Sequence, residues 1–262
     1  KDTELQESRL IVVKSPDHHI NLAASFWTFN GGLEALNFSL TAEQQALKLS
    51  VRKFAQNELP EIALEIERDD QPPSLALKQR FGELGYLGVN LPTQYGGGGL
   101  SHLDAVLVLE EVAKISISVA FPIFESCFGP TLAIAHFGSD QMKETIIPKV
   151  CSGDMVVAVS MSEPEAGSAL TDLKTSARVE DDEIILNGTK RWCSGAGHSE
   201  AYVVYCRLDE SPGARGIGAV LVHKGTPGFS FGKRDHHMGF RGVYSADMHF
   251  DDVRIPITDI LT

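Results

Sequence analysis

The sequence predicts an α+β protein, in which an α-helical domain is followed by an antiparallel β domain of barrel or sandwich type. Up to about residue 154, apolar residues recur at helical spacing. From Met155 onward, short runs rich in β-branched and aromatic residues alternate with Gly, Pro, Asp and Asn turns. We therefore expect an extension of unknown role at 1–36, a helical domain at 37–154 and a β domain at 155–262.

The first predicted helix has a clear start signal. Thr41 can act as its N-cap, and Gln44 stands at the third helical position of a capping box. Apolar residues then recur at helical spacing until Pro60, which predicts a helix over about 42–58. Further helices are expected to begin near Ser74, Leu100, Pro130 and Ser139.

The run "YGGGGL" at 95–100 is predicted to be a loop, because consecutive glycines make a helix costly in backbone entropy. A phosphate-binding role is disfavoured, since no strand precedes the glycines and no GK[ST] follows them. The predicted strands of the β domain lie in the following segments: 155–163, 176–182, 183–194, 201–209, 217–225, 229–234 and 246–256.

Composition excludes several classes of function. The chain of 262 residues carries a formal net charge of −12 and shows no clustered basic face, which argues against nucleic-acid binding. No apolar run is expected to reach the roughly 18 residues of a membrane span. The first residues do not resemble a targeting segment, so we expect a cytoplasmic protein, or a mitochondrial-matrix protein if the source is eukaryotic.

Cysteine and histidine spacing offers little support for a metal site. The four cysteines contain no CxxC pair, which favours neither a disulfide framework nor a zinc site. The pairs His18–His19 and His236–His237 are adjacent residues, which point to opposite faces of an extended strand. No matching set of ligands is spaced to join them, so we expect no metal ion.

The segment 162–195, "SEPEAGSALTDLKTSARVEDDEIILNGTKRWCSG", is the most informative part of the sequence. It combines hydroxyl side chains, a turn of small residues and an indole. Together with the helical segments 40–60 and 84–114 and the late run "MGFRGVYSADMHFDDVRIP", this segment resembles the acyl-CoA dehydrogenase family. The resemblance covers about 38–256, with several separate motifs in the family's order.

The resemblance implies that FAD lies against the β domain. Ser162 occupies the position of a hydroxyl residue that meets the pyrimidine edge of the flavin, and Met161 supplies neighbouring backbone. Ser168 corresponds to a serine near the pyrophosphate, where a hydroxyl group and amides hold an anion. Trp192 corresponds to the aromatic residue beside the flavin ring, and Ser194 to a hydroxyl facing the reactive N5.

Each of these residues also has a simpler interpretation. Trp192 could belong to the core, as an indole on a strand often does. The serines could be ordinary turn residues. Glu125, in "FPIFESCFG", corresponds to a position that lines the base of the acyl-binding pocket in some members, but it could equally be a helix-terminal carboxylate that faces water.

The sequence also departs from the family pattern. The usual "EPGAGSD" reads "EPEAGSA" here, so Glu165 and Ala169 replace a glycine and an acid. Ser194 stands where threonine is usual, and 243–246 read "VYSA" in place of a polar run. Substrate preference therefore cannot be transferred from the family.

The resemblance implies α,β-dehydrogenation of an acyl-CoA thioester. It also implies an acceptor such as an electron-transfer flavoprotein, and a homo-oligomer. In this family the catalytic base is a glutamate of a later helical domain, so we expect the base beyond Thr262 and no turnover by these residues alone. The alternative is a non-catalytic member that binds flavin, acyl-CoA or a partner.

Overall fold

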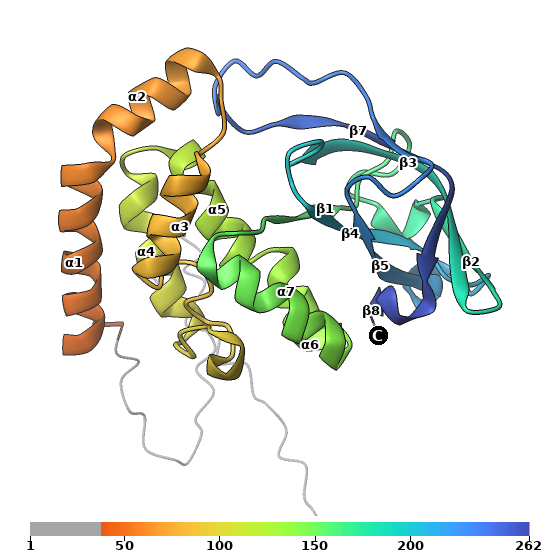
Figure 1. The fold of residues 1–262 in the computed structure, drawn as a ribbon, viewed down its shortest axis with the longest axis horizontal. Helices are drawn as coiled ribbons and strands as arrows, with labels where there is room; N and C mark the ends of the chain where they lie inside the picture. Colours follow the sequence, from red (N-terminus) through yellow and green to blue (C-terminus); the bar gives the residue numbers. More distant parts are fainter. Residues whose placement is uncertain (1–37, 262) are drawn as a thin grey trace, which may run out of the picture. The chain divides into compact units, whose positions relative to one another are not determined.

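The computed structural model describes residues 38–261, and residues 40–262 form one compact unit (Figure 1). The extension predicted at 1–36 and the pair His18–His19 lie outside the described residues. Helices occupy the N-terminal half of this unit and strands the C-terminal half. The change from helix to strand falls between Ser152 and Val157.

Seven α-helices precede the first strand within the described residues. They are α1 (Ala42–Glu58), α2 (Pro60–Asp69), α3 (Leu75–Glu83), α4 (His102–Ala113), α5 (Ile117–Cys127), α6 (Pro130–Phe137) and α7 (Asp140–Ser152). The predicted capping box of α1 is confirmed, because Gln44 N donates to Thr41 Oγ1 at 3.2 Å and Thr41 N donates to Gln44 Oε1 at 3.1 Å.

Two helices, α2 and α5, were missed by the sequence analysis, and each contains a proline. Pro60 ends the predicted first helix, but it also begins α2, since the first helical position needs no amide donor. Pro122 lies inside α5, where a proline normally disfavours a helix. Burial of most of α5 stabilises it in spite of that proline.

The glycine-rich segment after α3 is a loop, as predicted. A side chain at Gly97 would meet the backbone of Leu91, and one at Gly98 would meet the backbone of Val89. These glycines therefore allow two backbone segments to pack closely.

Eight strands form one sheet. They are β1 (Val157–Ser160), β2 (Ser176–Glu180), β3 (Glu183–Ser194), β4 (Ala201–Arg207), β5 (Ile217–His223), β6 (Phe229–Phe231), β7 (Ser245–Pro256) and β8 (Ile260–Leu261). The order is β6-β7-β3-β2-β4-β5-β8, and β1 pairs with β4. The predicted antiparallel pairing is confirmed for most of the sheet, and two contacts are parallel, the pairing of β1 with β4 and the short contact between β2 and β4.

Helices and sheet share part of their core. One cluster lies among the helices and the loop after α3, and a second lies within the β domain. A third cluster joins α6 and α7, through Ile134, Ile146 and Ile147, to Val157 and Val203 of the sheet. Burial of apolar surface in this cluster fixes the helices against β1 and β4.

One segment is longer and more apolar than the sequence analysis expected. The segment Ile117–Phe137 is long and apolar enough, by length and composition, to cross a membrane. In the fold it comprises α5 and α6, and 61% of its most apolar window is buried inside the protein. Core helices of soluble proteins pass the same test, so this segment is weak support for a membrane span.

Candidate functional site

A cavity of about 410 Å³ lies between α5, the start of α6 and strands β1, β3 and β4. Its lining includes Met161, Ser162, Trp192, Ser194 and Glu125. The fold thus brings together five of the six residues that the sequence analysis selected. We call this space the large cavity.

Trp192 reaches the large cavity because β3 is irregular at this point. The register between β3 and β7 shifts between Lys190 and Cys193, and Trp192 has a φ of 55°. Such bulges re-aim side chains, and positive φ is unusual for a bulky residue. The indole is 63% exposed and lies 5.2 Å from the Arg191 guanidinium, which excludes the core interpretation.

Two hydroxyl groups that line the large cavity are available to a ligand. Neither the Ser162 nor the Ser194 side chain makes a hydrogen bond to any residue that the structure describes. Both residues are half-buried. Their hydroxyl groups can therefore donate to polar atoms of a bound molecule without breaking an internal bond.

The backbone beside these hydroxyls is held firmly. Arg191 N donates to Ser162 O at 2.8 Å, and Lys190 Nζ donates to Met161 O at 2.9 Å. Lys190 also donates to Glu163 Oε1 at 2.8 Å, and both side chains of this ion pair are buried.

Glu163 organises the turn that follows β1. Its carboxylate accepts hydrogen bonds from Lys174 N at 2.6 Å and from Thr175 N at 2.9 Å. Burial would raise the pKa of Glu163, but the hydrogen bonds from Lys190, Thr175 and Lys174 outweigh burial and lower it. Glu163 is therefore an ionised carboxylate that fixes the turn.

Ser168 and Glu165 lie on the exposed part of that turn. Ser168 is not among the residues that line the large cavity, so its assignment to a pyrophosphate site stays a prediction. Glu165 has no left-handed backbone conformation and pairs with Lys174 at 3.2 Å. The replacement of a glycine by Glu165 thus introduces no backbone strain.

Glu125 is buried and faces cavities rather than bulk water. It lies in the last turn of α5, is only 7% exposed and lines the large cavity. Burial raises the pKa of its carboxyl group to about 8, with Lys78 opposing and Glu200 adding to the increase. The water-facing alternative is excluded.

The remaining acidic candidates are engaged elsewhere. Glu110 pairs with Lys48 at 3.0 Å, and the buried Glu111 pairs with Arg52 at 2.8 Å, and both partners belong to α1. Hydrogen bonding to Arg52 outweighs burial and lowers the pKa of Glu111 to about 2. Among residues 38–261, Glu125 is the one carboxylate that lines the large cavity.

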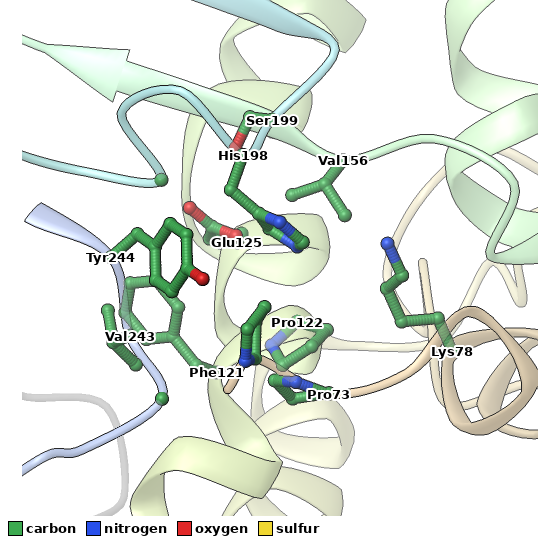
Figure 2. A pocket seen from close by; sticks show the side chains of 13 residues that line it. Pro73, Lys78, Phe121, Pro122, Glu125, Val156, His198, Ser199, Val243 and Tyr244 are labelled. Carbon is green, nitrogen blue, oxygen red and sulfur yellow. The ribbon is translucent and has the colours of Figure 1, made fainter. Parts of the chain in front are cut away.

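Sequence reasoning missed a second group of polar residues, which shares a cavity with Glu125. Lys78, His198, Ser199 and Tyr244 line a smaller cavity next to Glu125 (Figure 2). One signal was present in the sequence, because Lys78 falls three residues before the buried Phe81 and so interrupts the apolar stripe of α3. Among the residues that the structure describes, no group of three His, Cys, Asp or Glu side chains could hold a metal ion.

Two models of known protein families match most of the chain. Residues 41–154 match the acyl-CoA dehydrogenase N-terminal domain, and residues 158–253 match the acyl-CoA dehydrogenase middle domain. An acryloyl-CoA reductase (NADH) of Anaerotignum propionicum is 35% identical over 87% of this chain and 58% of its own length. A mitochondrial isovaleryl-CoA dehydrogenase of Pongo abelii is 36% identical over 87% of this chain and 54% of its own length.

Solved structures agree with these sequence relatives. A glutaryl-CoA dehydrogenase in complex with glutaryl-CoA has a TM-score of 0.81 and 28% identity, covering 86% of this chain and 58% of that one. A glutaryl-CoA dehydrogenase of Mycobacterium smegmatis in complex with FADH2 has a TM-score of 0.76 and 25% identity, covering 84% of this chain and 55% of that one. The chain thus spans less than two thirds of the length of each of these relatives.

Proposed function

Since the chain belongs to the acyl-CoA dehydrogenase family, we propose that it binds FAD and an acyl-CoA thioester and takes part in α,β-dehydrogenation of that thioester. One observation carries the proposal. Five of the six residues assigned to flavin and acyl binding, from separate parts of the sequence, line one cavity, with two free hydroxyl groups and a re-aimed indole.

The residues of the large cavity fit a flavin. Trp192 offers an exposed indole face for a planar ring, and the Ser162 and Ser194 hydroxyls offer donors for its polar edge. A bound flavin would supply the acceptor for the hydride and its two electrons. The role of the protein in the reaction would be to position the ring and to hold polar groups at fixed points around it.

The wall formed by α5 fits an acyl chain. Phe121, Phe124 and Phe128 line the large cavity beside Glu125, and adjacent rings stack with centroids 5.8 Å and 6.4 Å apart. These aromatic side chains would cover an alkyl group and exclude water from it. The neutral carboxyl group of Glu125 would end the pocket without placing a charge there below about pH 8.

We propose further that the base that removes the α-proton is not one of the carboxylates of residues 38–261. Glu110, Glu111 and Glu163 are bound in ion pairs, and burial, which raises the pKa of Glu125 to about 8, keeps its carboxyl group mostly protonated at neutral pH. A base must be ionised and within hydrogen-bond reach of the proton that it removes. An electron-transfer flavoprotein as acceptor, assembly into a homo-oligomer and a cytoplasmic or mitochondrial-matrix location belong to the same proposal.

An anaerobic flavin assay tests this function. The chain is loaded with FAD, saturated acyl-CoA thioesters are added in the absence of oxygen, and the visible flavin band is followed. We expect the thioester to perturb the band by binding, without bleaching at a catalytic rate. Catalytic bleaching would place the base within these 262 residues, and Glu125→Gln would then identify or exclude Glu125. No binding of FAD at all would favour the non-catalytic alternative.

A further inference from the structure

A second cavity, of about 30 Å³, is lined by Glu125 and by a set of residues that does not include Met161, Ser162, Trp192 or Ser194 (Figure 2). Lys78 of α3, Phe121 and Glu125 of α5, and His198 and Ser199 after β3 contribute to its lining. Because a water molecule needs roughly 10–15 Å³ by this kind of measure, the space can hold one or two waters or a small polar group. We call it the polar cavity.

Within 38–261, the side chains of Lys78, Glu125 and Ser199 in the polar cavity lack hydrogen-bond partners. The Lys78 ammonium points into the cavity, although the residue is only 6% exposed, and it makes no hydrogen bond or ion pair within 38–261 (Figure 2). The Glu125 carboxyl group also makes no hydrogen bond or ion pair within 38–261. The fully buried Ser199 hydroxyl has no hydrogen-bond partner there either. Since leaving a buried cation unpaired is costly, such a group indicates a ligand that supplies the missing bonds.

The groups around the polar cavity leave it positively charged. The pKa of His198 is lowered, mainly by burial and next by the charge of Lys78, which favours the neutral imidazole. Glu125 is neutral below about pH 8. The carboxylate of Glu200 accepts from Val156 N at 2.7 Å, and the Lys224 ammonium donates to Gly197 O. These two opposite charges are bound to backbone groups, so the Lys78 charge is left without a counterion.

Hydrogen bonds and an ion pair fix two other segments that line the polar cavity, around Pro72 and around Tyr244. Arg234 pairs with Asp70 at 2.7 Å, and Gly242 N donates to the same carboxylate at 2.8 Å. The Tyr244 hydroxyl donates to Gln71 Oε1 at 3.0 Å. These bonds join the segment before α3 to the segment before β7, so the polar cavity is a preformed space.

The polar cavity adjoins the proposed acyl-binding wall, because Glu125 and Phe121 line both cavities. We propose that Lys78, Ser199 and Glu125 bind a carboxylate at the far end of the acyl chain, so that the substrate class is a CoA monothioester of a short dicarboxylic acid. This inference rests on the function proposed above. A terminal carboxylate would pair with the Lys78 ammonium and accept hydrogen bonds from the Ser199 hydroxyl and the Glu125 carboxyl.

Binding of two thioesters of equal chain length tests the inference. Pentanoyl-CoA and glutaryl-CoA each carry five acyl carbons, and only glutaryl-CoA ends in a carboxylate. Their dissociation constants are measured by calorimetry with the FAD-loaded 262-residue chain and with Lys78→Met. We expect the parent to bind glutaryl-CoA at least about tenfold more tightly than pentanoyl-CoA, and Lys78→Met to lose this preference.

Two further variants complete the design. Lys53→Met removes the same charge from an exposed position on α1 and should keep the preference. Ser199→Ala removes one donor with little change in volume, and should reduce the preference about threefold even if Lys78→Met does not fold. Equal binding of the two thioesters by the parent would overturn the inference and leave the proposed function standing. If neither thioester binds, the proposed function fails, and the inference fails with it.

Discussion

The carboxyl group of Glu125 couples the stability of the protein to pH. Its folded-state pKa of about 8 lies above its usual value of 4.5, so the folded state binds more protons than the unfolded state between these limits. The contribution of Glu125 to stability is complete below about pH 4.5 and is lost as pH rises to about 8. We expect Glu125→Gln to flatten this decline, measured by urea unfolding from pH 5 to pH 8. Parallel pH profiles for parent and variant would show that Glu125 is ionised in the fold.

Trp192 exposes most of its indole beside the large cavity, and a bound planar ligand would cover it. Trp192→Ala should weaken FAD binding several-fold, because stacked aromatic contacts contribute on the order of 1 kcal/mol beyond burial. Trp192→Phe serves as the control and should retain most of the affinity. The measurement is a fluorescence titration with FAD. Unchanged affinity in Trp192→Ala would remove the indole from the flavin site.

At the scale of elements, the turn between β1 and β2 depends on the buried Glu163–Lys190 pair. Lys190→Met would leave the Glu163 carboxylate without its cation and would free Met161 O. We expect a loss of roughly 3–5 kcal/mol in the free energy of unfolding, measured with urea. Lys174→Met, which breaks the exposed pair with Glu165, should cost less than about 1 kcal/mol. Similar losses in the two variants would contradict this assignment.

The exposed part of the same turn affects anion binding. Glu165 lies three residues before Ser168, the predicted pyrophosphate contact, and Lys174 offsets only part of its charge. Glu165→Gly should therefore tighten FAD binding at low ionic strength, and the gain should shrink as salt screens the repulsion. An affinity that is equal or lower at low salt would place the pyrophosphate elsewhere.

At the scale of the whole molecule, local signals predicted most elements and long-range pairing did not follow from them. The capping box of Thr41 and Gln44 predicts the start of α1, and runs of β-branched residues predict the strands. The helices α2 and α5 were not predicted. Each contains a proline that the fold tolerates, since Pro60 stands at a first helical position and Pro122 lies in a buried helix. The parallel pairing of β1 with β4 depends on tertiary contacts with α6 and α7, which no periodicity records.

The candidate site was predictable to a similar extent. The family motifs located Met161, Ser162, Trp192, Ser194 and Glu125, which the fold collects in the large cavity. The polar cavity could not be foreseen, because Lys78 and Ser199 are far apart in the sequence and meet only when α3 packs beside the segment after β3. The charged Lys78 in the apolar stripe of α3 was the one local signal of this cavity in the sequence.

Equilibrium dialysis of FAD against the 262-residue chain tests the central claim, that the large cavity is a flavin site. The account predicts saturable binding of one FAD per chain, weakened at least tenfold when Trp192→Ala and Ser194→Ala are combined. Circular dichroism would establish that the double variant remains folded. The account would be contradicted if the parent shows no saturable binding, or if a folded double variant binds FAD as tightly as the parent.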